Sequence, residues 1–307
     1  MKLSVSTYGI IPHVGIDAGF AMIARAGFDC VDLDLMFMYP WADIKKKAGT
    51  PWMSMSDGEM LQAMKPYKDA MQKYGLFCGQ AHALDPTYMP DPDLYKQLLY
   101  ITQRQIMLCH YLDCHYLIIH PAHHLFYEEY LPAEQEWELN IQMFSQLIPW
   151  LKKYNVIACL ENMYTEHNGA SYAAPCQKPE EACRYIDTLN EMASEKRFAF
   201  CLDTGHAMFA GLELRNTIRT LGDRLVALHL NDNDGVHDQH RMPYMGKVDW
   251  ERLVDGLREI DYAYTLNFET SFKEVPTTLL PESLQYTAAA GRLLAKRISE
   301  RHNSASL

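Results

Sequence analysis

The chain has 307 residues, 48% of them hydrophobic, which is long enough to bury a sizeable core, and barrel folds of this size commonly form one domain. Its 39 acidic and 28 basic residues give a formal net charge of −11, which argues against nucleic acid as a partner. No apolar run reaches the roughly 20 residues that cross a bilayer, and the amino terminus lacks a signal-peptide pattern. We therefore expect a cytoplasmic protein with no membrane partner.

Short apolar runs alternate along the chain with longer amphipathic stretches, which is typical of a parallel sheet covered by helices. In chain order, the predicted strands cover residues 3–9, 30–35, 76–84, 114–122, 156–163, 198–206, 225–232 and 265–271. The predicted helices that follow them cover residues 16–26, 57–74, 92–112, 134–154, 178–193, 212–221, 248–259 and 282–300. Eight strand-helix pairs predict a single α/β domain, a (β/α)₈ TIM barrel over residues 1–301, followed by a C-terminal tail at 302–307.

The connections after the second, fourth and fifth predicted strands are long and rich in aromatic residues, at 36–56, 123–132 and 164–177. Loops at this face of a barrel commonly carry function, so these segments are candidate walls of a pocket. Aromatic loops can also simply cover the barrel mouth, and the sequence leaves that choice open. No Gly-rich phosphate loop follows any strand, which counts against a nucleotide-binding fold.

The eight cysteines form no C-x-x-C pair, and four of them (Cys30, Cys78, Cys159 and Cys201) lie inside the apolar strand-like runs. Buried cysteines in a reducing compartment remain free thiols. We therefore predict free thiols in preference to disulfides or a thiolate metal site.

Each of the last six predicted strands ends in a histidine or a carboxylate. In chain order these residues are His82, His120, Glu161, Asp203 with His206, His229 with Asp232, and Glu269. One such residue alone is more often structural than a ligand, but in a barrel six consecutive strand ends converge on one small volume. Carboxylates gathered there would repel one another unless a cation held them, so the pattern predicts a divalent metal. Oxygen and imidazole donors suit Mn²⁺, Co²⁺, Mg²⁺, Fe²⁺ or Zn²⁺ and do not choose among them.

Four segments, CLENM, CLDTGHAMFAG, HLNDNDGVHDQHRMPYMGKVDW and NFET, occur in an order that resembles the xylose-isomerase-like superfamily of barrels. That superfamily contains sugar isomerases, ketose 3-epimerases, inositol-catabolism enzymes and endonuclease IV. The resemblance implies a metal site of Glu161, Asp203, His229 and Glu269, in which Glu161 and Glu269 also form the acid/base pair. It further implies a metal-dependent isomerase or epimerase that moves a proton on a small sugar or sugar phosphate through an enediolate.

The same resemblance leaves other functions open. Endonuclease IV has three zinc ions, and its additional ligands have equivalents here in His82, His120, His206, Asp238 and His240, which in a sugar enzyme would instead contact substrate or support the metal ligands. An endonuclease IV-like phosphodiesterase, a keto-inositol dehydratase and a non-catalytic sugar-binding barrel are therefore alternatives. The oligomeric state is also open, a homo-oligomer included.

Several further residues are candidate substrate contacts, each with a competing structural role. Tyr8 and Trp41 could stack on a sugar face or pack in the core, and Arg241 could bind a hydroxyl or phosphate or lie on the surface. The same two interpretations, a substrate contact or a surface residue, apply to Lys247, His123 and His124. His110, His115 and His302 are expected to be structural or exposed.

Overall fold

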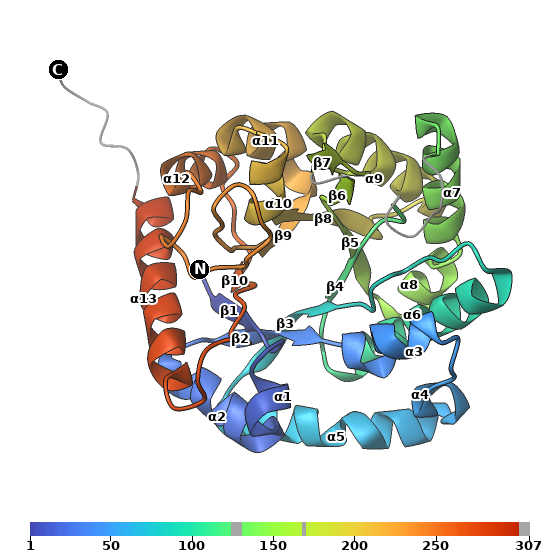
Figure 1. Cartoon of the computed structure of the whole chain (residues 1–307), viewed down its shortest axis with the longest axis horizontal. Helices are drawn as coiled ribbons and strands as arrows, with labels where there is room; N and C mark the ends of the chain where they lie inside the picture. Colours follow the sequence, from blue (N-terminus) through green and yellow to red (C-terminus); the bar gives the residue numbers. More distant parts are fainter. Residues whose placement is uncertain (124–130, 168–169, 301–307) are drawn as a thin grey trace.

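The computed structural model describes residues 1–123, 131–167 and 170–300 of the chain. Eight parallel strands pair in the order β10-β1-β2-β3-β4-β5-β8-β9, and helices surround them (Figure 1). The strands are β1 (Leu3–Ser6), β2 (Cys30–Asp34), β3 (Phe77–His82), β4 (Tyr116–Ile119), β5 (Ile157–Glu161), β8 (Phe198–Asp203), β9 (Leu225–His229) and β10 (Leu266–Phe268). The fold is the predicted (β/α)₈ barrel, while the tail predicted at 302–307 lies outside the described residues.

The barrel closes between β9 and β10. Leu230, directly after β9, donates its N–H to the carbonyl of Asn267 at 2.8 Å and accepts the N–H of Glu269 at 3.1 Å. An isolated parallel bridge also pairs Leu230 with Phe268. Because a closed parallel barrel brings all its strand ends to one mouth, residues that are far apart in the chain meet there.

The helices of the outer ring follow the sequence signals for their ends. They are α2 (Ile16–Ala26), α5 (Asp57–Tyr74), α6 (Pro92–Tyr111), α7 (Ala133–Ser145), α8 (Ile148–Tyr154), α9 (Pro179–Ala193), α11 (Leu214–Leu221), α12 (Trp250–Glu259) and α13 (Leu280–Ser299). Ser56 and Glu59 form a capping box at the start of α5. Gly75 ends that helix with a φ of 70°, a left-handed conformation that glycine adopts without steric cost.

The largest differences from the sequence prediction lie in three regions. The helix predicted over 134–154 is two helices, α7 and α8, because Pro149 has no N–H and its ring would clash with the carbonyl four residues earlier in a continuous helix. The loop at 36–56 contains η1 (Met36–Met38), α3 (Trp41–Lys45) and α4 (Pro51–Ser54). The loop at 164–177 contains an antiparallel hairpin of β6 (Tyr164–His167) and β7 (Ala170–Ala173). Residues 124–130, His124 among them, lie outside the described part.

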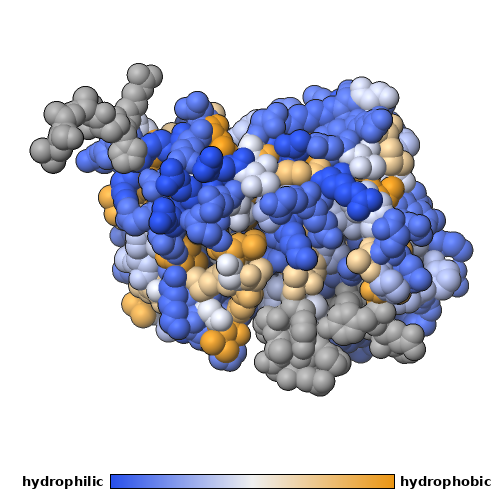
Figure 2. Space-filling model, turned by 90° about the horizontal axis from the view of Figure 1, so that it is seen from above, coloured by the Kyte–Doolittle hydropathy of each residue, from blue (hydrophilic) through white to orange (hydrophobic). Residues whose placement is uncertain are grey.

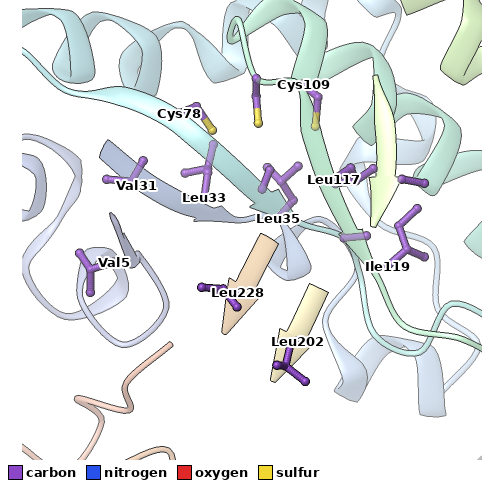
Figure 3. Packing of buried hydrophobic residues seen from close by; sticks show 14 of the residues in the cluster. Val5, Val31, Leu33, Leu35, Cys78, Cys109, Leu117, Ile119, Leu202 and Leu228 are labelled. Atoms are coloured by element: carbon purple, nitrogen blue, oxygen red, sulfur yellow. The ribbon is translucent and has the colours of Figure 1, made fainter. Parts of the chain in front are cut away.

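The main core fills the space between the strands and the helices. Figure 3 shows part of it, in which Val31, Leu33 and Leu117 of the strands belong to one cluster with Cys109 of α6. Alternate residues of each strand instead face the barrel interior. One region of that interior, here called the apolar half, comes from β4, β5, β8 and β9 and consists of Ile118, Cys159, Ala199, Cys201, Val226 and Ala227.

The rest of the interior, here called the polar half, consists of Ser4, Asp32, Gln80 and Asn267 from β1, β2, β3 and β10. All four residues are at most 1% exposed. Gln80 reaches across the barrel, where its Nε2 lies 3.4 Å from the carbonyl oxygen of Leu228 on β9. The polar half therefore lies inside the barrel, below the strand ends.

Hydrophilic residues predominate on the face of the molecule drawn in Figure 2, in keeping with the surplus of acidic residues. None of the helices in the described ranges is long and apolar enough to cross a membrane. All eight cysteines are free thiols, and seven of them are buried.

Candidate metal centre

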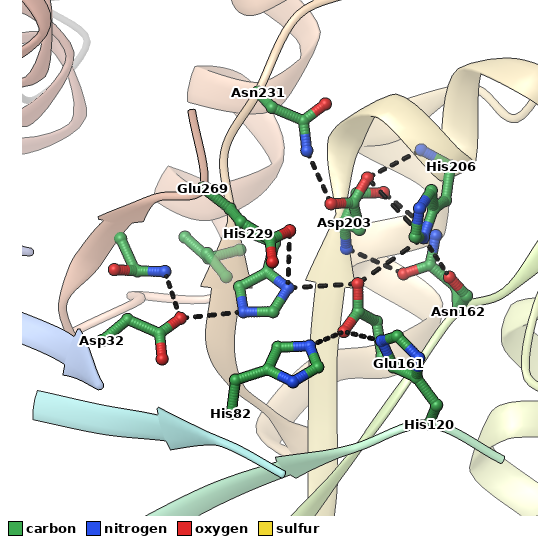
Figure 4. Close-up of polar contacts among 12 residues, drawn as sticks. Asp32, His82, His120, Glu161, Asn162, Asp203, His206, His229, Asn231 and Glu269 are labelled. Atoms are coloured by element: carbon green, nitrogen blue, oxygen red, sulfur yellow. Dashed lines mark hydrogen bonds and ion pairs between the residues drawn. The ribbon is translucent and has the colours of Figure 1, made fainter. Parts of the chain in front are cut away.

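Four side chains meet at the mouth of the barrel. Glu161, Asp203 and His229 are the last residues of β5, β8 and β9, and Glu269 directly follows β10. One nitrogen or oxygen atom from each of the four lies within 4.8 Å of the corresponding atoms of the other three (Figure 4). The first three side chains are at most 1% exposed and Glu269 is 14% exposed. The structure therefore brings together the four residues that the sequence proposed as metal ligands.

The contacts of His229 fit a bound cation. Its Nδ1 lies 3.1 Å from Glu161 Oε1 and 3.2 Å from Glu269 Oε2. His229 Nδ1 and Glu161 Oε2 are buried, and neither atom makes a hydrogen bond to a described residue. Buried polar atoms are normally satisfied, and imidazole nitrogen with carboxylate oxygen is a donor set suited to a divalent ion. The residues present thus fit the predicted metal.

Glu161 also belongs to a second group, with His82 and His120. Its Oε2 lies 3.2 Å from His120 Nε2 and 3.7 Å from His82 Nε2. The other ring nitrogens have partners of their own, since His120 Nδ1 lies 3.1 Å from Asp85 Oδ1 and His82 Nδ1 lies 2.8 Å from the carbonyl of Ala83. These contacts hold both rings with Nε2 toward Glu161, in a geometry that could also hold a metal ion.

His206, Asp238 and His240 form a third group of this kind. Asp238 Oδ2 lies 3.0 Å from His240 Nε2 and 3.7 Å from His206 Nε2. The sequence predicted that His206 ends a strand, and this was wrong. His206 lies in the short helix α10 (Thr204–Phe209), and its backbone N–H donates to Asp203 Oδ1 at 2.7 Å. His240 has a φ of 44°, a conformation that is uncommon for residues other than glycine.

The two glutamates differ in their electrostatic surroundings. Burial acts to raise the pKa of Glu161, but the neighbouring His229 and His120 hold that pKa well below its ordinary value. For Glu269, burial dominates over His229 and His240, and its pKa is raised. Burial lowers the pKa of His120, yet the carboxylates of Glu161 and Asp85 raise it to about 10. The histidines and carboxylates of the site therefore stabilise each other's charged forms.

A cavity of about 410 Å³ opens above these groups. His82, His120, His206, Asp238 and His240, which the sequence assigned to substrate or additional metal, all line it. So do Tyr8, Tyr164 of the hairpin, and His123, which is 1% exposed. Lys273 also lines the cavity, with its Nζ 4.3 Å from the centroid of the Tyr8 ring. Sequence reasoning missed Lys273, because it lies in an irregular segment after β10 where no motif marks it.

Other candidate contacts lie away from this cavity. Trp41 is 40% exposed in α3, with Lys45 Nζ 4.9 Å from its ring centroid, and is not among the cavity-lining residues. Arg241 lies near Asp234 and the carbonyl of Met245, while Lys247 lines a separate hollow beside α11. His110 and His115 are exposed, as expected.

Asp232 has a structural role after β9. Its carboxylate is fully buried and accepts hydrogen bonds from the N–H groups of Asn233 and Val248 and from the indole N–H of Trp250. These contacts fold the loop that carries Asp238 and His240. A cysteine also approaches the four-residue site, since Cys201 Sγ lies within 4.8 Å of ligand atoms of Glu161 and His229. Sequence reasoning did not assign either role.

Comparisons with known proteins extend over most of the chain. The sequence pattern of the xylose isomerase-like TIM barrel family matches residues 20–290. A probable endonuclease 4 of Thermoplasma acidophilum is 27% identical over 177 residues, which cover 54% of this chain and 56% of that protein. The chain spans between 30% and 58% of the length of the curated relatives it matches.

Solved structures share the fold over nearly their whole length. A D-tagatose 3-epimerase-like protein superposes with a TM-score of 0.70 at 18% sequence identity, covering 97% of each chain. The IOLI protein with a bound zinc atom superposes with a TM-score of 0.72 at 16% identity, covering 98% of this chain and 100% of that one. At these identities the likeness establishes the barrel fold.

Proposed function

Because the chain belongs to the xylose isomerase-like TIM barrel family, we propose that it is a divalent-metal-dependent isomerase or epimerase of a small sugar or sugar phosphate. The observation that carries the proposal is the pair of glutamates, Glu161 and Glu269, which both approach Nδ1 of His229 at the floor of the cavity. Proton transfer next to a carbonyl needs one group that removes a proton and one that returns a proton. Two carboxylates from different strands can supply both.

Glu161, Asp203, His229 and Glu269 would hold the metal. When bound, a divalent ion polarises the substrate carbonyl and stabilises the charge that develops on oxygen. Each glutamate has two oxygens, so one oxygen of each can remain free to carry a proton. One glutamate takes the proton next to the carbonyl, giving an enediolate. The other returns a proton, either to the opposite face of the same carbon or to the neighbouring carbon.

The size and lining of the cavity support a small-molecule substrate. Its volume of about 410 Å³ lies in the range of small-molecule sites and fits a monosaccharide. Lys273 is the one lysine or arginine among the described residues that line it, and no ion pair ties Lys273 to a described carboxylate. A phosphate group on the substrate would therefore find a cationic partner in the wall of the cavity. The Lys273→Met variant should raise the KM for a sugar phosphate and leave that for the unphosphorylated sugar nearly unchanged.

The test is turnover of a panel of ketoses, aldoses and their phosphates with each of the five candidate metals, read by exchange of substrate protons with deuterated water. Glu161→Gln and Glu269→Gln should each lower kcat by about 10²-fold to 10⁴-fold. The exposed Glu282→Gln on α13 is the matched control and should be unaffected. Near-normal exchange in both active-site variants would contradict the proposal.

A second candidate function is hydrolysis of a phosphodiester. It is favoured by the three adjoining groups, because Glu161 belongs to two of them and its Oε1 and Oε2 face different histidines. If ions occupied both groups, neither oxygen of Glu161 would be free to move a proton. The partial matches to probable endonuclease 4 proteins point the same way, whereas the net charge of −11 argues against a DNA substrate.

The third group separates these candidates. In a phosphodiesterase, His240→Ala should remove an ion and abolish cleavage of an abasic-site duplex or a small phosphodiester. In an isomerase, the same variant should change the KM for the sugar more than it changes the rate of proton exchange at saturating substrate. A keto-inositol in the substrate panel tests the dehydratase alternative, since dehydration begins with the same proton abstraction. Metal binding without turnover of any substrate would favour a sugar-binding barrel.

A further inference from the structure

Asp32 is a buried carboxylate that the site described so far does not use. It lies in β2, is 0% exposed, and points into the barrel interior below the cavity. One of its oxygens, Oδ2, has three polar partners on three other strands, and Figure 4 shows its contact with His229. These are His229 Nε2 at 3.0 Å, Gln80 Nε2 at 3.0 Å and Asn267 Nδ2 at 2.9 Å. Such convergence on one oxygen fixes the carboxylate in place.

The contact with His229 determines which ring nitrogen faces the cavity. An ionised carboxylate oxygen can only accept hydrogen bonds, so Nε2 of His229 must carry the hydrogen. In the neutral imidazole that binds a metal, the lone pair then lies on Nδ1, the atom that approaches Glu161 Oε1 and Glu269 Oε2 and makes no hydrogen bond to a described residue. A nitrogen lone pair and two carboxylate oxygens that face the same point can bind a cation there together.

The surroundings of Asp32 also show why a charged group is kept there. An unpaired buried carboxylate is costly, and no described lysine or arginine forms an ion pair with Asp32. Gln80 and Asn267 supply neutral donors, and His229 is the one partner that can carry positive charge. A carboxylate that accepts the second N–H of a metal-bound histidine orients the ring and makes it a stronger ligand.

We propose that Asp32 is a positioning residue that holds His229 with Nδ1 toward the cation site and so raises the affinity of that site for its metal. The proposal rests on the metal site of the proposed function, but it does not depend on which reaction the site performs. Its consequence is that a residue without access to the cavity controls metal binding through His229.

The experiment is a double-mutant cycle on metal affinity. Co²⁺ is titrated into the whole protein by calorimetry, and bound ions are counted by mass spectrometry. The ion that His229→Gln weakens identifies the site. Asp32→Asn should weaken the same ion by about 10-fold to 100-fold. In the His229→Gln background, Asp32→Asn should cause no further loss, because the residue acts through His229.

A matched control separates positioning from a general loss of stability. Asn190 also makes three hydrogen bonds, to the N–H groups of Arg197 and Phe198 and the carbonyl of Phe198, at the opposite end of β8 from the site. Asn190→Ala should lower the unfolding temperature and leave Co²⁺ affinity unchanged. Wild-type affinity in Asp32→Asn, or an equal loss in both His229 backgrounds, would overturn the proposal.

A second measurement needs no variant. Nitrogen-15 spectra of histidine-labelled protein with Zn²⁺ bound report which nitrogen of His229 carries the hydrogen, and Nε2 is expected. Protonation at Nδ1 alone would contradict the proposal, as would a wild-type protein that binds no Co²⁺. Neither experiment uses turnover. Loss of Co²⁺ affinity in Asp32→Asn, with no isomerisation by the wild type, would reject the proposed reaction and retain the role of Asp32.

Discussion

The two halves of the barrel interior are equally buried and chemically opposite. The apolar half, on β4, β5, β8 and β9, packs Ile118 against small residues such as Ala199 and Cys201. The polar half, on β10, β1, β2 and β3, contains Asp32 with its donors Gln80 and Asn267. Burying polar groups costs stability unless each is hydrogen-bonded. The polar half is therefore better explained by what it does for the site above it than by any gain in stability.

The two halves contribute differently to the metal site, because different strands carry the ligands and the hydrogen bonds. Glu161, Asp203 and His229 are the last residues of strands in the apolar half. The packing of the strands beneath them therefore fixes the backbone positions from which these three side chains extend. The polar half contributes one ligand, Glu269, after β10, and its hydrogen bonds converge on the ring of His229 through Asp32. Packing therefore places the ligands, and polar contacts orient them. Substitutions in the two halves should then affect different properties.

Ile118→Ala should give the largest change in stability. Ile118 is 0% exposed in β4, and truncating a buried isoleucine leaves a cavity that costs about 2–5 kcal/mol of unfolding free energy. Ile118 belongs to the apolar half and is not a hydrogen-bond partner of Asp32, so the Co²⁺ affinity of the folded protein should stay within about twofold of wild type. Denaturant unfolding and calorimetric titration check both values. A large loss of Co²⁺ affinity without a loss of unfolding free energy would contradict the different roles of the two halves.

Gln80→Leu should have the reverse effect. The substitution keeps the volume and removes one of the three donors to Asp32 Oδ2. A hydrogen bond to a charged group contributes about 1.5–3 kcal/mol. If about 1 kcal/mol of that reaches the metal site through His229, Co²⁺ should bind roughly fivefold more weakly. The unfolding free energy should change less than in Ile118→Ala. Unaltered Co²⁺ affinity would show that the polar half does not act on the site.

Glu136→Gln should give the smallest effect, outside the barrel interior. Glu136 lies in α7, where burial and then the nearby Glu181 raise its pKa to about 7. Because the pKa is above the ordinary 4.5, the folded state binds the proton more tightly, and stability falls as pH rises from about 4.5 to 7.

The Glu136→Gln variant should lack this part of the pH dependence and be more stable than wild type by about 1 kcal/mol at pH 8, after allowance for partial exposure. Thermal unfolding at pH 4.5 and pH 8 measures the difference. If the stability difference between the variant and the wild type is the same at both pH values, the pKa of Glu136 is not raised in the folded state and this prediction is wrong.

Much of the fold was predictable because strand periodicity and helix-stop glycines are local signals. Gly27 and Gly75 end α2 and α5 where the sequence placed these ends. The errors also have local causes. Pro149 was a signal for the break between α7 and α8, and Asp203 was a signal for the start of α10, because aspartate is a favoured N-cap. The Asn168-Gly169 pair likewise marks a hairpin in the sequence.

The site was predictable only in part. The four proposed ligands follow from polar residues at the ends of apolar strands, whereas Asp238 and His240 lie in a loop and were found through the family resemblance. Asp32 was not predictable, because its three partners are 48, 197 and 235 residues away in the chain. An aspartate within a strand-like run carries no signal that three distant side chains will converge on it.

The most direct test of the account is the crystal structure of the protein grown with Mn²⁺, with the ion located by its anomalous scattering. We expect an anomalous peak bounded by Glu161, Asp203, His229 and Glu269, with Nδ1 of His229 rather than Nε2 among the coordinating atoms. Density for Mn²⁺ elsewhere with these four side chains left uncoordinated, or no bound Mn²⁺ at millimolar concentration, would contradict it.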